Sequence, residues 1–136
     1  MPKIIWTDAF AIGNPEIDRQ HQEWVEIYNR AHDRMMTGGT DELSSLGFDA
    51  LVEIINYVEY HFCFEENFMR EIRYPGIVAH QRLHKNFTHD MYQYRADFQE
   101  GRTVLNTEII KTIENWFMDH ILVEDKKIRP YLKAPN

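Results

Sequence analysis

The sequence has little of what marks secreted or membrane-spanning proteins. It contains a single cysteine, Cys63, so no disulfide can form within the chain, and a reducing compartment is compatible with this composition. No apolar run approaches the roughly 18 residues that a membrane span requires. The first residues also lack the continuous apolar core of a signal peptide. We therefore expect a cytoplasmic protein with no membrane span.

Clustered basic residues are also missing. The chain has 15 Lys and Arg against 22 Asp and Glu, a formal net charge of −7, and no stretch concentrates the cations. Binding to a phosphate backbone depends on clustered cations, so nucleic acid is not an expected partner. The 136 residues are 43% hydrophobic and 13% aromatic, which is enough for a single globular domain over 1–136 with a buried core.

Apolar residues recur at steps of three and four along most of the chain, the period of an amphipathic helix. No alternating, strand-like run occurs. Helices are expected to start near Pro15, Thr40 or Asp41, Ile77 and Leu105, with stop signals at Gly38-Gly39, Pro75 and Gly101. Asn14 is the expected N-cap of the first helix. The sequence predicts an all-α fold, an antiparallel up-down-up-down four-helix bundle with an N-terminal arm over 1–14 and a C-terminal tail over 126–136.

Seven polar residues interrupt the apolar stripes of these helices. They are His21, His61, Glu65, His80, His84, His120 and Asp125. His61 and Glu65 are four residues apart, as are His80 and His84, so each pair shares one face of its helix. Asp125 follows His120 by five residues, so a helix end or slight unwinding is needed to aim it inward. At a rise of about 1.5 Å per residue, all seven fall in one layer near one end of the bundle.

The residue types in this layer indicate a metal site. A lone His on an apolar face is commonly a satisfied structural residue, but five with two carboxylates across four helices are not. Imidazole and carboxylate together suit a borderline transition metal rather than calcium or magnesium. Seven ligands exceed the need of one ion, so we expect two ions bridged by Glu65 and Asp125. Iron, manganese and zinc all remain candidates.

The order and spacing of these residues resemble the signature of the hemerythrin family, and single-domain bacterial hemerythrins are the most similar. The likeness covers nearly the whole chain. It includes the phrase HFCFEE that begins at His61, a Tyr-Pro turn, and a Trp four residues before His120.

The resemblance implies a non-haem centre of two iron ions (Fe2+/Fe3+), bridged by the two carboxylates and by an oxo or hydroxo group. It also implies unequal irons. One would be saturated by three histidines, and the other would keep one open position beside two. The residues implied are His80, His84 and His120 at the saturated iron, and His21 and His61 at the open one.

The activity implied by the resemblance is reversible dioxygen binding at the open iron, for oxygen storage or delivery, without enzyme activity. An oxygen-consuming protein is a candidate partner, and a monomer is the favoured state. One alternative is an oxygen or redox sensor module that signals by docking to a separate protein. Another is a di-iron oxidase or peroxidase, which should have a carboxylate-rich site and a nearby proton donor. Iron storage and nitric oxide handling are further alternatives.

Several neighbours of these ligand candidates allow two interpretations. Aromatic residues on the same stripes either line an oxygen pocket or form ordinary core; they are Trp24, Tyr28, Phe62, Trp116 and Phe117. Phe117 would narrow the pocket if it faced the open iron. We expect Cys63 to face away from the metals, and His32 and His89 not to be ligands. Glu66 and Glu124 should lie on solvated faces or contact the ligands from outside.

Overall fold

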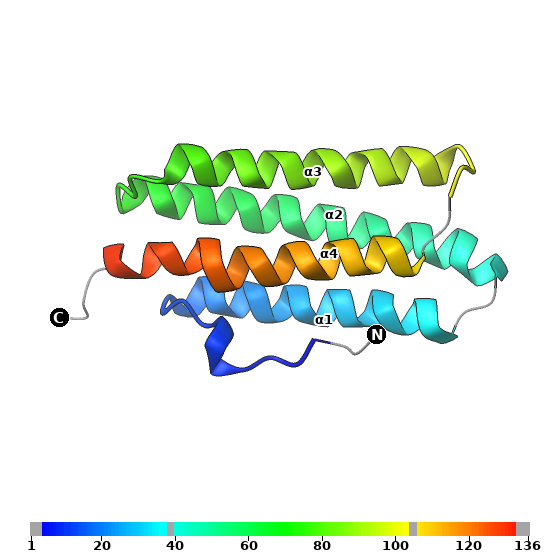
Figure 1. Ribbon diagram of the computed structural model, residues 1–136, viewed down its shortest axis with the longest axis horizontal. Coiled ribbons are helices and arrows are strands. Elements are labelled where there is room, and N and C mark those ends of the chain that lie inside the picture. The colour runs from blue at the N-terminus through cyan, green and yellow to red at the C-terminus, as the bar shows by residue number, and fades with distance from the viewer. Residues whose placement is uncertain (1–3, 38–39, 104–105, 133–136) are drawn as a thin grey trace.

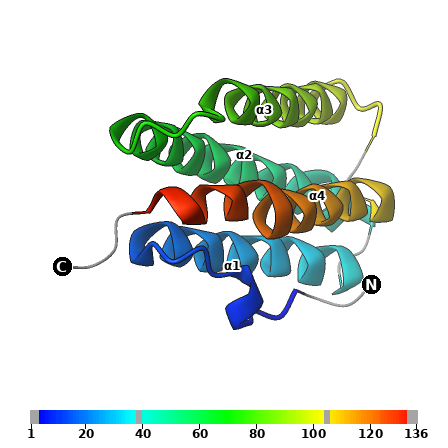
Figure 2. The ribbon, with the colours of Figure 1, turned by 60° about the vertical axis from the view of Figure 1, so that its left-hand side comes forward.

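Four helices run alternately up and down in the computed structural model of the chain (Figure 1 and Figure 2). The structure describes residues 4–37, 40–103 and 106–132, and over 37 and 40–46 it describes the backbone alone. The helices are α1 (Pro15–Thr37), α2 (Thr40–Glu71), α3 (Ile77–Gln99) and α4 (Thr107–Asp119). Three short elements complete the fold: η1 (Asp8–Phe10), the π-helical turn η2 (His120–Glu124) and the 3-10 segment η3 (Asp125–Tyr131).

The predicted all-α up-down-up-down bundle is confirmed. α1 packs against α2 and α4, α2 packs against α3, and Phe87 of α3 stacks on Trp116 of α4, so consecutive helices are neighbours in space. Two of the expected signals, Gly38-Gly39 and Leu105, lie outside the described residues. The second helix begins at Thr40, within the predicted start at Thr40 or Asp41, and the side chains of its first turns lie outside the described part.

The helix ends follow the local signals of the sequence. Asn14 caps α1, because its Oδ1 accepts a hydrogen bond from the Ile17 N–H at 3.0 Å. Gly101 ends α3 with a φ of 73°, a left-handed conformation that glycine adopts without strain. Beyond it, the N–H of Arg102 bonds to the carbonyl of Asp97 at 2.9 Å, which closes the last turn of the helix.

The described part of the N-terminal arm lies along α1 (Figure 1). Asn29 of α1 holds its start through two hydrogen bonds with the Ile4 backbone, of 3.0 and 2.9 Å. Phe10 and Ile12 are buried, so the arm also covers part of the core.

The predicted tail is partly wrong. Residues 126–131 have no usable apolar period, yet they continue the fourth helix as η3. Ile128 on this segment is fully buried and packs with Met69 and Tyr74 in a small cluster of its own. Tertiary contacts with the α2–α3 turn therefore order a segment that local sequence pattern leaves unassigned.

Among the described residues, the core consists of two apolar clusters with a polar layer between them. Along α2, Phe62 belongs to the main cluster and Met69 to the small one, with Glu65 between them. Along α3, Phe87 belongs to the main cluster, and Ile77 packs on the small one. The polar layer is thus shielded from water on both sides along the bundle axis.

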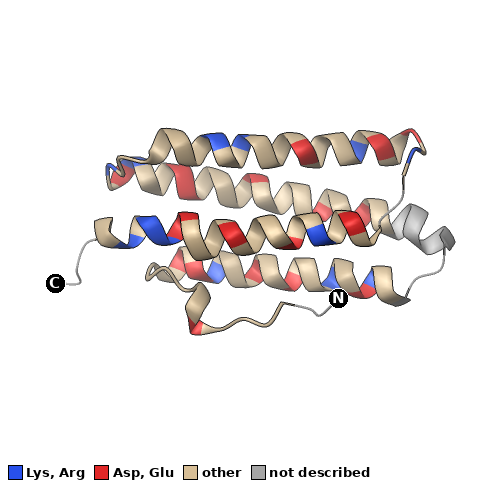
Figure 3. Cartoon of the chain, in the orientation of Figure 1, with Lys and Arg blue, Asp and Glu red and all other residues tan. Residues whose placement is uncertain are grey.

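The outer surface is mixed in charge. In the view of Figure 3, Lys and Arg lie among Asp and Glu on α1, α3 and α4, whereas the described part of α2 is mostly acidic. No helix among the described residues is both long and apolar enough to cross a bilayer.

Replacing Asn14 with alanine should lower the free energy of unfolding by about 1 kcal/mol, because the first turn of α1 loses its capping acceptor. Urea titration followed by circular dichroism measures the change. Asn14→Asp, which keeps an acceptor, should remain near wild type. The exposed Asn86→Ala on α3 serves as the matched control and should cause no loss. Equal stability of Asn14→Ala and wild type would contradict the capping role.

Candidate metal centre

All four helical segments contribute to one buried polar layer. The seven residues singled out in the sequence are each 2% exposed or less. α1 provides one of them, α2 and α3 provide two each, and the last two begin η2 and η3. They are His21 on α1, His61 and Glu65 on α2, His80 and His84 on α3, and His120 and Asp125 beyond α4.

The π-helical turn η2 explains how His120 and Asp125 reach the same place. In an α-helix, residues five apart point about 140° away from each other around the axis. Here the Asp125 N–H bonds to the carbonyl of His120, an i to i+5 bond that widens the turn. Both side chains therefore face the bundle interior. The unwinding expected from the five-residue spacing is confirmed.

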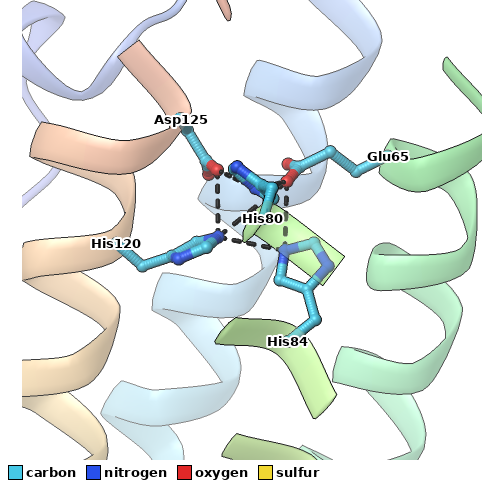
Figure 4. Close-up of side chains that lie close together, drawn as sticks. All are labelled: Glu65, His80, His84, His120 and Asp125. Atoms are coloured by element: carbon cyan, nitrogen blue, oxygen red, sulfur yellow. Dashed lines mark hydrogen bonds and ion pairs between the residues drawn. The ribbon is translucent and has the colours of Figure 1, made fainter. Parts of the chain in front are cut away.

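Glu65 divides its two oxygens between two sets of histidines. Its Oε1 lies 2.8 Å from Nε2 of His80 and 3.2 Å from Nε2 of His84 (Figure 4). Its Oε2 lies 3.2 Å from Nε2 of His61 and 3.5 Å from Nε2 of His21. The carboxylate therefore spans the two sets.

Asp125 divides its oxygens in the same way. Its Oδ1 lies 2.9 Å from Nε2 of His80 and 3.0 Å from Nε2 of His120 (Figure 4). Its Oδ2 lies 3.1 Å from Nε2 of His21. Two carboxylates that each face both sets are in the arrangement that bridging ligands require.

The donors form two groups of unequal size. Within each group, one ligand atom per residue lies within 4.8 Å of all the others. The larger group has three histidines and two carboxylates, and the smaller has two histidines and the same two carboxylates. The members are Glu65, His80, His84, His120 and Asp125 in the first, and His21, His61, Glu65 and Asp125 in the second.

Chemically, the cluster fits metal cations. Glu65 Oε2 and both oxygens of Asp125 are buried and lie within ion-pair distance of imidazole nitrogens of the layer, which carry the compensating charge only while they are protonated. The Nε2 atoms of His84 and His120 face each other at 3.0 Å, and those of His21 and His61 at 3.1 Å. Convergent imidazole nitrogens beside carboxylates are ligands that a borderline transition metal prefers.

Comparison with known proteins decides the family. The family model described as "Hemerythrin HHE cation binding domain" matches residues 13–132. The chain belongs to the hemerythrin family.

Individual relatives match nearly the whole length of the chain. A protein named Bacteriohemerythrin from Stenotrophomonas maltophilia (strain R551-3) is 31% identical, and the match covers 98% of this chain and 84% of the relative. A Bacteriohemerythrin from Methylococcus capsulatus is 29% identical, with 98% and 100% covered. The crystal structure of a wild-type hemerythrin, at 28% identity, superposes with a TM-score of 0.87 and covers 98% of this chain and 100% of that one.

Aromatic rings pack directly against the histidines of this hemerythrin-type site. Phe62 stacks on His84 with ring centroids 3.8 Å apart, and Trp116 stacks on His120 at 4.3 Å. The Trp24 ring lies 5.8 Å from His61. These three residues therefore belong to the core and to the wall of the site at once.

The other two aromatic candidates lie farther from the histidines of the site. Phe117 is buried and meets Trp24 edge-on, with ring centroids 4.6 Å apart. It therefore backs the wall on the His61 side. Tyr28 donates its hydroxyl to Glu114 at 2.9 Å and belongs to the main core.

The remaining neighbours lie where the sequence suggested. Cys63 is exposed and faces away from the cluster, and neither His32 nor His89 belongs to a donor group. Glu124 is on the surface and pairs with Lys127. Glu66 contacts the cluster from outside, as one of the two interpretations predicted: its Oε2 accepts a hydrogen bond from Nδ1 of His84 at 3.0 Å.

Sequence reasoning missed Gln20. Its side chain is fully buried, and its Oε1 lies 2.8 Å from Nδ1 of His61. The sequence offered one signal that Gln20 could contact the site: it directly precedes His21, on the helix turn that also carries Glu16 and Arg19. That signal is weak, since a glutamine beside a stripe is usually solvated.

The carboxylates change the protonation of the histidines around them. Burial lowers the pKa of His21, but hydrogen bonds to Asp125 and Glu65 outweigh it and raise the pKa to about 9. The same balance raises the pKa of His80 to about 10. For His120, burial again opposes and Asp125 again prevails, giving a pKa of about 9. Burial lowers the pKa of His61. In the absence of metal, three imidazoles of the layer thus hold protons at neutral pH.

Metal binding should therefore release protons near neutral pH, because ligating imidazoles must be deprotonated. Titration calorimetry of the metal-free protein with Zn2+, in buffers of different ionisation enthalpy, counts the protons. The release should shrink as the pH rises through 9 to 10, where the three raised pKa values lie. Zinc binding without proton release at neutral pH would contradict this charge distribution.

Proposed function

We propose that this hemerythrin-family chain binds dioxygen reversibly at a non-haem di-iron centre, for oxygen storage or delivery. The proposed ligands are the two donor groups described above, with Glu65 and Asp125 shared between the ions and a solvent-derived oxo or hydroxo group as a further bridge. When bound, the iron pair would supply two electrons and an open coordination position for the gas.

The observation that carries this proposal is the difference of one donor between the groups. The larger group adds three histidines to the shared carboxylates, and the smaller adds only His21 and His61. Two six-coordinate ions that also share a solvent oxygen would leave one position free, and it would lie on the side of the smaller group. An open position is the structural mark of a site that binds an exogenous ligand.

The surroundings of the smaller group favour binding over oxidation. Trp24 and Phe117 close the main-core side with aromatic rings, which exclude water. The Trp24 indole nitrogen is buried without a hydrogen-bond partner. An indole N–H can donate a hydrogen bond but does not deliver a proton at physiological pH. Gln20, which contacts His61, is a neutral amide, so the described residues around the smaller group offer little help with breaking an O–O bond.

Two alternatives follow from the same site. A di-iron oxidase or peroxidase would be favoured by an acid beside the smaller group, and the structure shows an amide and an indole there. A sensor module would bind the same gas at the same place, and its signal would depend on a protein partner. The oxidase and the carrier differ in whether oxygen leaves unchanged.

The iron-loaded protein, reduced without air, should gain a visible charge-transfer band when oxygen is added and lose it when oxygen is removed. The open position would let oxygen bind, and the lack of a proton donor among the described residues around the smaller group would let it leave unchanged. Absorption spectra over repeated cycles of oxygen and argon measure this behaviour. Rapid, irreversible bleaching with release of peroxide would count against a carrier and favour the oxidase.

His61→Ala should lose the ion at the smaller group, because only His21 and the shared carboxylates would remain to hold it. Metal analysis should give about one ion per chain instead of two, and the oxygen-dependent band should disappear. His89→Ala removes an exposed histidine of the neighbouring helix and is the matched control, with two ions retained. Two ions and a normal band in His61→Ala would refute the assignment.

A further inference from the structure

The two donor groups also differ in the residue that hydrogen-bonds a histidine at Nδ1, the ring nitrogen that faces away from the cluster. In Figure 4 the second ring nitrogen of His84 points away from the cluster. That nitrogen, Nδ1, donates to the Glu66 carboxylate at 3.0 Å. On the other side, Nδ1 of His61 lies 2.8 Å from Oε1 of Gln20. One histidine thus has an anionic partner and the other a neutral one.

A hydrogen-bond chain fixes the orientation of the Gln20 amide. The amide nitrogen donates to Oε1 of Glu16 at 3.1 Å, and a carboxylate can only accept. The amide oxygen must therefore face His61, whose Nδ1 carries the proton. Nε2 of His61 then presents its lone pair to the site. Arg19 anchors the chain, because its guanidinium donates to both Glu16 oxygens at 2.6 and 3.1 Å.

The carboxylate on the other side is less strongly neutralised. Among the described residues Glu66 forms no close ion pair with a lysine or arginine, whereas the Glu16 charge is matched by Arg19. Glu66 is 22% exposed, and a hydrogen bond from Gln81 and the charge of Arg70 also act on it. Its carboxylate contacts the Nδ1 atom of His84 directly at 3.0 Å.

We propose that Glu66 and Gln20 are positioning residues that make the two metal positions electronically unequal. A carboxylate behind a ligating histidine raises the basicity of the ligand, and a neutral amide does so much less. Glu66 therefore stabilises the higher oxidation state at the three-histidine position. Gln20 keeps the two-histidine position electron-poor and favours its reduced state, which is ready for an exogenous ligand. This inference rests on the metal pair proposed above, but not on the identity of the gas.

Glu66→Gln is the sharpest test, because it keeps the size and the accepting oxygen and removes only the charge. The midpoint potential of the iron-loaded protein should rise. A tenfold change in the ratio of oxidised to reduced metal corresponds to about 59 mV for one electron. Glu124→Gln is the matched control, since Glu124 lies near His120 but bonds to Lys127. An equal shift in both variants, or no shift in Glu66→Gln, would overturn the proposal.

The reverse change is available on the other side without altering the net charge. The double substitution Glu16→Gln and Gln20→Glu exchanges amide and carboxylate along one hydrogen bond, and it places the charge against His61. The midpoint potential should fall relative to wild type, which has the same net charge and keeps the amide at position 20. A rise, or no difference from wild type, would count against the electronic role of Gln20.

Zinc-loaded protein separates this inference from oxygen binding, because zinc has no redox chemistry. Glu66→Gln should weaken the binding of one zinc ion about 10-fold to 100-fold in competition with a chelator. Wild-type-like zinc retention would count against the Glu66 contact. If wild type fails to bind oxygen while these shifts appear, the oxygen proposal fails and the tuning role stands. If oxygen binds reversibly and the shifts are absent, the tuning role alone fails.

Discussion

Two carboxylates without exposed surface, Glu65 and Asp125, are the constraint on which the rest of the structure depends. A buried charge is tolerated only when other charges or strong donors surround it. The bundle meets that requirement by directing five imidazole Nε2 atoms at the four carboxylate oxygens, from all sides of one layer. Because each carboxylate faces both sets of histidines, the layer divides into two adjoining groups rather than one large one.

The apolar parts of the fold can be understood from this layer outward. The main cluster and the small cluster around Met69 and Ile128 shield the layer along the bundle axis. Aromatic rings stack on His84 and His120 of the layer, so the same contacts pack the core and orient these two imidazoles. Polar contacts from Gln20 and Glu66 orient the Nδ1 atoms of His61 and of His84. The environment of each group is therefore set jointly by rings that exclude water and by single hydrogen bonds.

Much of this could be predicted from the sequence, since it depends on relations within one helix. The spacing of His61 and Glu65, or of His80 and His84, places each pair on one face whatever the partners are. The stop at Pro75 and Gly101, and the cap at Asn14, also act locally. Local relations do not extend to segment 126–131, which was predicted as part of a tail. Its helical structure depends on contact of Ile128 with the α2–α3 turn and not on its own sequence pattern.

By itself, the sequence determined the number of helices, their direction and the layer in which seven polar residues meet, because helical period and turn signals are properties of neighbours along the chain. Tertiary structure alone decided which oxygen of Glu65 faces which histidines, that His120 and Asp125 meet through a π-helical turn, and that Gln20 stands behind His61 while Glu66 stands behind His84. These relations join different helices or depend on the exact winding of one. They follow from how each helix is rotated and shifted against its neighbours, which all the packed side chains of the core settle together.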